Sequence, residues 1–250
     1  MGFIDDFKVD QELQVKTLCV AFFLVIFPLY FFSVAAGTDS PEGMGGVGSY
    51  EVSGEITYIN FESGEETIAD GSPLIIDLNT DQLDDIADKN IVGVLVSMSY
   101  GEDETETPQT GPFGGIGTCN GPTGGQKAAD TITGTASHLN FSNSADGQNG
   151  GGDAEFAHDV STEWYNASMI GTVENPVVVE GLSESSIVDQ LDAKGAGLGD
   201  YNIEISVAAN AGGGATCDRS DSGETVSYTI QLIVLDYSIR PYVDVDDIDL

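Results

Sequence analysis

The 250-residue chain has 42 acidic and only 7 basic residues, which gives a formal net charge of −35 at pH 7. Such an acidic surface repels nucleic acid and anionic lipid headgroups, so it excludes proteins that bind either, and it favours cations and basic partners. The length allows one large β domain or two small ones.

Residues 17–36, TLCVAFFLVIFPLYFFSVAA, form an uncharged apolar run. A helix of this length covers the roughly 30 Å hydrocarbon core of a bilayer. Lys8 and Lys16 precede the run, and no Lys or Arg follows before Lys89. Because positive charge is retained in the cytoplasm, residues 1–16 are predicted to be cytoplasmic and the chain after residue 36 to be extracytoplasmic. The sequence therefore predicts a single-pass cell-membrane protein whose residues 17–36 contact membrane lipid.

A cleaved signal peptide is the alternative for this segment. The small residues Ser33, Val34, Ala35 and Ala36 would suit a signal peptidase. The length of the apolar run and the long, acid-bearing leader before it favour a retained anchor.

A flexible Gly-rich stalk is expected at 37–49, followed by alternating apolar and polar residues. We expect a strand at 50–58, a short strand at 74–76, a short helix at 80–88 and a strong strand at 91–100. The last of these has an unbroken apolar row on one face: Val92, Val94, Val96, Met98 and Tyr100.

The second half has the same character. A long Gly- and Pro-rich loop at 101–127 precedes a weaker strand at 131–141, and 142–153 has the composition of a turn or disordered tip. Beyond them we expect strands at 154–164, 167–173 and 176–179, a helix at 183–192 capped by Ser183, and strong strands at 201–207 and 225–239. Residues 241–250 form an acidic tail.

Short strands with polar, Gly-rich connections and two short helices predict an all-β fold, an antiparallel β-sandwich over residues 50–240. The loop at 101–127 could divide this region into two smaller sandwiches.

The segment GDYNIEISV at 199–207, followed by the apolar row at 226–234, resembles the last two strands of an immunoglobulin-like or related sandwich, a jelly roll among them. Tyr201 stands where such domains place a corner tyrosine. Ile203 occupies the position of the cysteine that antibody-type domains carry, which argues against a domain of that type. The acidic composition also resembles surface proteins of salt-adapted or marine archaea. These resemblances imply a halophilic binding or structural module and no particular chemistry.

Cys119 and Cys217 both lie in Gly-rich segments of the exported part, which predicts one disulfide between them. Asn140 and Asn166 begin Asn-x-Ser sequons and are candidate glycosylation sites.

No phosphate-binding loop, zinc signature or nucleophile elbow occurs. Calcium, which prefers oxygen ligands from acidic loops, is the metal that the composition favours. Two acidic runs supply the candidate ligands, one in the tail and one in the long loop: Asp244, Asp246, Asp247, Asp249; and Glu102, Asp103, Glu104, Glu106. Neither has the spacing of an EF-hand. His158 beside Asp159 is a weaker metal candidate.

We therefore predict a membrane-anchored extracytoplasmic sandwich without catalysis, with a structural, adhesive or complex-forming role and a protein partner in the membrane or cell envelope. One alternative is an accessory subunit of a membrane complex held by its transmembrane helix. The other is a secreted carbohydrate-binding or hydrolytic domain, which would need exposed aromatic residues such as Phe156, Trp164 and Tyr165.

Overall fold

The computed structural model describes residues 22–26, 46–101, 104–111, 116–120, 123–148 and 155–242. The chain divides into two units, Met1–Gly48 and Ser49–Leu250. Of the predicted anchor at 17–36, only the one-turn π-helix η1 (Phe22–Ile26) falls within the described residues. None of the helices in the described ranges has the length and apolarity needed to cross a membrane. The acidic tail from residue 243 lies outside these ranges.

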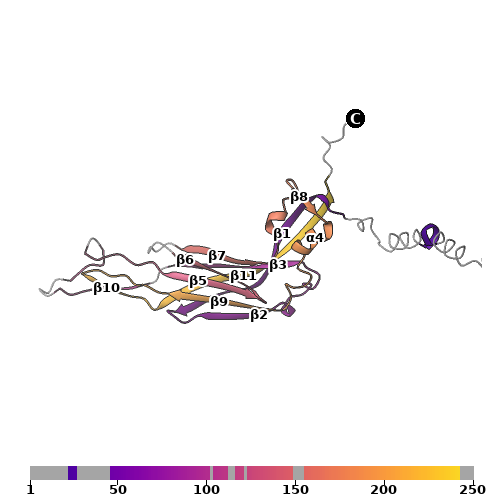
Figure 1. Ribbon diagram of the computed structural model, residues 1–250. Helices are drawn as coiled ribbons and strands as arrows, with labels where there is room; N and C mark the ends of the chain where they lie inside the picture. Colours follow the sequence, from indigo (N-terminus) through magenta and orange to yellow (C-terminus); the bar gives the residue numbers. More distant parts are fainter. Residues whose placement is uncertain are drawn as a thin grey trace, which may run out of the picture. The chain divides into compact units, whose positions relative to one another are not determined.

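The second unit is an all-β structure of antiparallel sheets with few helices, as predicted (Figure 1). A five-stranded sheet has the order β7-β3-β11-β1-β8, and a four-stranded sheet has the order β2-β9-β5-β6. A two-stranded sheet pairs β4 with β10. The strands are β1 (Gly48–Ala69), β2 (Leu74–Asn79), β3 (Ile91–Tyr100), β4 (Thr105–Pro108), β5 (Thr131–His138), β6 (Phe141–Gln148), β7 (Phe156–Glu163), β8 (Val177–Leu182), β9 (Asp200–Ala208), β10 (Cys217–Ser220) and β11 (Gly223–Pro241).

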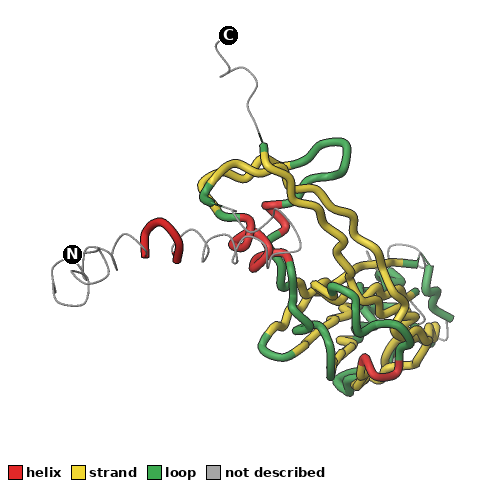
Figure 2. The backbone as a smooth tube through the Cα atoms, turned by 90° about the vertical axis from the view of Figure 1, so that its right-hand side faces the viewer, coloured by secondary structure: helices red, strands yellow, loops and turns green. Residues whose placement is uncertain are grey.

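The two longest strands, β1 and β11, pair antiparallel along nearly their whole length (Figure 2). Tyr50 lies opposite Pro241 at one end of this pair, and Ala69 lies opposite Gly223 at the other. At about 3.3 Å per residue, the 19 residues of β11 span about 60 Å. The chain therefore enters the second unit at one end of a long two-stranded ladder.

The main core lies between the five-stranded and four-stranded sheets. Four residues of the predicted β3 row, Val94, Val96, Met98 and Tyr100, are buried there, facing the row of β9 formed by Tyr201, Ile203, Ile205 and Val207. The fifth, Val92, is buried in the second core instead. The open side between β6 and β7 is closed by close packing. A Cβ added to Gly147 of β6 would lie 2.1 Å from Nδ1 of His158 on β7, so only glycine fits there.

A second core covers the opposite face of the five-stranded sheet, at the end where the chain enters. Helix α4 (Glu184–Leu191) packs there through Ile187 and Leu191, together with Ile233 and Leu235 of β11. Ser183 is the N-cap, as predicted, since its side chain accepts a hydrogen bond from the Ser186 N–H. The long strands thus have one face in each core.

Three predicted local structures are wrong. Residues 80–88 form only the 3-10 turn η3 (Thr80–Gln82), because four aspartates in this segment favour caps and turns over a helix interior. Residues 142–148 belong to strand β6, where one face carries Asn143, Ala145 and Gly147, so no hydrophobic alternation marks the strand. Residues 167–169 form the 3-10 helix η4 (Ala167–Met169) instead of a strand. In addition, the long loop at 101–127 contains β4.

The resemblance to an immunoglobulin-like ending is only partly correct. The Tyr201 hydroxyl donates to the Gly197 carbonyl at 2.7 Å, as a corner tyrosine would. However, β9 and β11 do not pair with each other, because β9 lies between β2 and β5 in one sheet and β11 between β1 and β3 in the other. The apolar rows establish that each strand has a buried face, but they do not determine which sheet each strand joins.

Candidate functional site

The tip of the second unit consists of β4, β10, which begins at Cys217, and the loops beside them, one of which carries Cys119. It follows the ends of β3 and β1 that lie opposite the chain entry. The predicted disulfide is present, with the two Cα atoms 4.8 Å apart, and it closes a loop between positions 98 residues apart in the sequence. The disulfide therefore ties the long loop after β3 to the strand that precedes β11.

Arg219 organises this tip from within. Its side chain is only 2% exposed and forms an ion pair with Glu106, in which Nε lies 2.9 Å from Oε1. The same guanidinium donates to the carbonyl oxygens of Gly124 and Cys119. One planar cation thus links the disulfide loop to the β4–β10 ribbon, which suits arginine because its donors are fixed in one plane.

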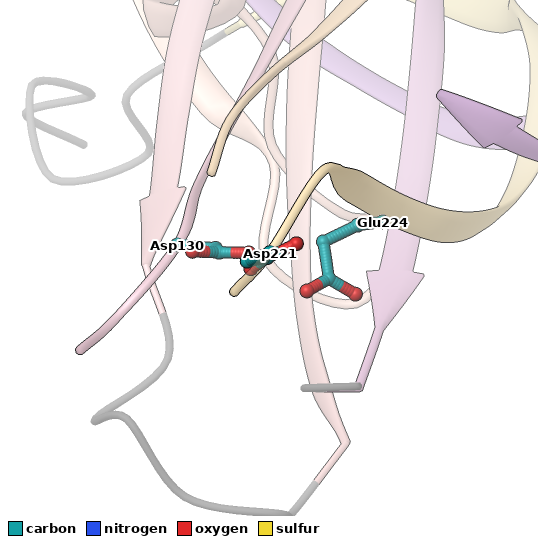
Figure 3. Close-up of side chains that lie close together, drawn as sticks. All are labelled: Asp130, Asp221 and Glu224. Atoms are coloured by element: carbon teal, nitrogen blue, oxygen red, sulfur yellow. The ribbon is translucent and has the colours of Figure 1, made fainter. Parts of the chain in front are cut away.

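Three carboxyl groups meet where the tip joins the sandwich (Figure 3). Asp130 precedes β5, Asp221 lies between β10 and β11, and Glu224 is in β11. One oxygen from each lies within 4.8 Å of the others, and the side chains of Asp130 and Glu224 are fully buried. Asp130 Oδ1 accepts from the Asn210 N–H at 2.6 Å, and Asp221 Oδ1 accepts from the Gly223 N–H at 3.0 Å.

Burial is the main influence on this acidic cluster, and it raises the pKa of Asp130. Hydrogen bonds involving Glu224 and the Asn210 N–H oppose that rise, while Asp221 adds to it. Oxygen ligands of this kind suit calcium or another hard cation. A shared proton would relieve the same repulsion, so the geometry alone does not make this cluster a metal site.

The acidic runs that the sequence suggested for calcium do not form a site in the described part of the chain. Glu104 is buried in an ion pair with Lys127, at 2.9 Å, and Glu106 is paired with Arg219. Glu102, Asp103 and the tail aspartates lie outside the described residues. The acidic cluster escaped prediction because its members come from three separate segments with no local spacing pattern.

The other sequence candidates lie apart from the tip. His158 faces the interior of the sandwich opposite Met98, whereas Asp159 is exposed, so this pair does not form the suggested metal site. Asn140 is exposed in the turn between β5 and β6. Asn166 caps η4 and donates to Gln190 at 2.8 Å, so its side chain already has structural partners. Glycosylation at either asparagine stays a prediction.

The aromatic group suggested for carbohydrate binding is used in packing. Trp164 Nε1 donates to the Ile91 carbonyl at 2.9 Å, Phe156 packs edge-on against Tyr100, and Tyr165 lies against the second core. Among the aromatic residues described after residue 46, only Tyr58 is exposed. These residues therefore provide no aromatic platform for a sugar.

Comparison with known proteins gives no family. No family model matches the chain, and no curated protein matches it. Among solved structures, it is similar to TmCBM61 in complex with β-1,4-galactotriose, with 9% identity, 77% of this chain and 88% of that chain covered, and a TM-score of 0.24. It is also similar to a family 11 carbohydrate-binding module from Clostridium thermocellum in complex with a mixed-linked tetrasaccharide, with 7% identity, coverage of 76% and 96%, and a TM-score of 0.22. Similarity this weak establishes no ligand for this chain.

Proposed function

We propose that this chain is a non-catalytic protein of the cell exterior, tethered to the membrane by residues 17–36, whose sandwich presents the tip for a structural or adhesive contact. The observation that carries the proposal is the register of β1 and β11. Tyr50, one residue after the chain enters the second unit, pairs with Pro241, whereas Ala69 pairs with Gly223 at the other end, beside the tip. A tether at residue 36 therefore joins the end of the unit opposite the tip.

Two further features support this proposal. A disulfide fits an oxidising, extracytoplasmic compartment. The tip is also held by Arg219 and by close backbone contact, since a Cβ on Gly125 would lie 2.0 Å from the Gly213 carbonyl oxygen. A fixed loop loses less conformational entropy on binding than a flexible one, which suits it to partner recognition. The proposal assigns no reaction to the chain.

The experiment that tests this proposal places a photoreactive amino acid at either end of the second unit. Ile116 lies in the tip and is 81% exposed, whereas Val173 lies near the chain entry and is 75% exposed. In intact cells, the Ile116 position should form discrete adducts with envelope components, and the matched Val173 position should form none. Adducts from Val173 alone, or from neither position, would contradict the proposal.

The same crosslinking experiment distinguishes this proposal from the alternative that the chain is an accessory subunit held by its transmembrane helix. If that alternative holds, a photoreactive residue in the apolar run, at Leu24 for example, should give the main protein adduct, and the Ile116 position in the tip should give none. That result would assign partner binding to the transmembrane segment.

A further inference from the structure

A polar cup on the four-stranded sheet, at the end away from the tip, has no part in the proposed function. It is an open hollow of about 470 Å³ where β2 and β5 end and β9 begins. Its side chains include two Asp-x-Asn segments, Asp77–Asn79 on β2 and Asp200–Asn202 on β9. Gln82, Ser137 and Leu139 complete the rim.

The antiparallel pairing of β2 with β9 joins these two segments reciprocally. Asp77 lies opposite Asn202, and Asn79 lies opposite Asp200. Asn202 Nδ2 donates to Asp77 Oδ1 at 2.7 Å, and Asn79 Nδ2 donates to Asp200 Oδ1 at 2.6 Å. Asn79 is further fixed because its Oδ1 accepts from the Asp81 N–H. Four polar side chains are thus held in place on rigid strands before any ligand arrives, as a binding site requires.

These internal bonds leave acceptors for a ligand. Each aspartate uses Oδ1 in its cross-strand bond, so its Oδ2 takes no part in that bond, and the same holds for the amide oxygen of Asn202. His138 also lines the cup, but its buried ring contacts the carbonyl oxygens of Asp200 and Ala196, which occupies both of its nitrogens. The cup is therefore rich in acceptors, and its complement is a ligand rich in donors.

Leu139 adds an apolar surface to the rim, although its backbone conformation is strained. It stands first in the two-residue turn between β5 and β6, with φ of +52°, in the left-handed region that favours glycine. Its side chain is nevertheless 70% exposed. A leucine that is both strained and exposed is a feature expected where it contacts something outside the chain.

The charges of the cup decide between ligand classes. Among the described residues that line it, two are aspartates and none is lysine or arginine, so an anionic ligand is repelled. A cation would gain only an exposed ion pair, which contributes little and weakens with salt. Neutral hydroxyl groups can donate to the ionised carboxylates, forming charge-assisted hydrogen bonds that do not depend on a net charge in the ligand.

We propose that this cup binds a neutral, hydroxyl-rich ligand, a sugar unit whose hydroxyl groups donate to Asp77 and Asp200 and whose carbon face lies on Leu139. The inference is independent of the proposed function, because it needs neither the tether nor a partner at the tip.

The test uses saturation-transfer NMR on the full chain in a detergent without a sugar headgroup. The neutral probes are the methyl glycosides of glucose, galactose, mannose and N-acetylglucosamine, with spermidine as the cationic probe and glucuronate as the anionic probe. At least one neutral probe should bind with a dissociation constant in the order of millimolar. Asp200→Asn replaces an acceptor by a donor and should weaken that binding about tenfold.

Glu204→Gln is the matched control. Glu204 lies on the same strand and the same face as Asp200 but outside the lining of the cup, so this variant should keep the affinity unchanged. Circular dichroism and melting confirm that both variants fold. The inference is wrong if no neutral probe binds at about 50 mM, if only spermidine or glucuronate binds, or if Asp200→Asn and Glu204→Gln lower the affinity equally.

Discussion

At the scale of single residues, desolvation is the largest influence on the pKa of several groups in the sandwich, among them Asp130, His158 and Tyr201. Desolvation raises the pKa of Asp130, a rise that hydrogen bonds with Glu224 and Asn210 oppose and Asp221 increases, and it lowers the pKa of His158 against the charges of Asp159 and Asp146. Desolvation also raises the pKa of Tyr201 beneath the cup.

His158 should make the protein sensitive to mild acid. Its folded pKa lies below 6.5, whereas in the unfolded chain it titrates near 6.5, so the unfolded state binds the proton more readily. Above pH 6.5, His158 should make its full contribution to the free energy of unfolding. That contribution should be lost as the pH falls below 6.5 toward the lower folded pKa. In denaturant titrations between about pH 7 and 5, His158→Gln should lose this part of the slope. Asp159→Asn removes a carboxylate that raises the pKa of His158, so it should keep or steepen this slope, and an unchanged slope in His158→Gln would refute the assignment.

Leu139 should be a stabilising position to mutate. Because glycine adopts positive φ without strain, Leu139→Gly should raise the free energy of unfolding by about 1 kcal/mol. Asn140→Gly, the adjacent control, should give no gain. Urea denaturation measures both, and a destabilised Leu139→Gly would mean that the exposed side chain has a packing role.

At the scale of elements, the clear apolar rows were predictable and the others were not. The β3 and β9 rows were predicted from alternation, and the α4 cap from Ser183, because a two-sheet core selects one face of each strand. Strand β6 was not predicted because the residues that pack against β7, Ala145 and Gly147, are small and give no apolar pattern. The cup was not predicted from the sequence either. The repeated Asp-x-Asn segments in two strands are visible there, but only the pairing of β2 with β9 brings them together.

The disulfide should be the main stabiliser of the tip. In the chain-entropy model, a closed loop of 98 residues contributes about 4–5 kcal/mol. The double variant Cys119→Ser and Cys217→Ser should therefore melt roughly 10 °C lower and exchange the amide hydrogens of β4 and β10 faster. Reduction of the wild-type protein should reproduce both effects. Unchanged melting and exchange would show that Arg219 and the close backbone contacts hold the tip alone.

At the scale of the whole molecule, the charge predicts a response to salt. Folding brings carboxylates together, so repulsion raises the free energy of the compact state. Raising sodium chloride from about 0.1 M to about 1 M shortens the screening length from about 10 Å to about 3 Å. The melting temperature of the full chain should rise over this range, and a flat profile would contradict the salt-adapted interpretation.

Calcium provides the control for this prediction. If salt acts by screening alone, calcium should raise the melting temperature no more than sodium does at the same ionic strength. A calcium-specific increase in melting temperature that Glu224→Gln abolishes would instead place a bound cation at Asp130, Asp221 and Glu224.

The central claim is that residues 17–36 hold the sandwich on the outer side of a membrane, and protease protection on intact cells tests it most directly. Protease added outside should remove the second unit, Ser49–Leu250, while a fragment containing residues 1–16 stays with the membranes after a carbonate wash. Mass spectrometry of the untreated protein should find the N-terminal segment still attached. A mature N-terminus at Ala36 or Gly37, or a second unit that is protected in intact cells and cut only after lysis, would contradict the account.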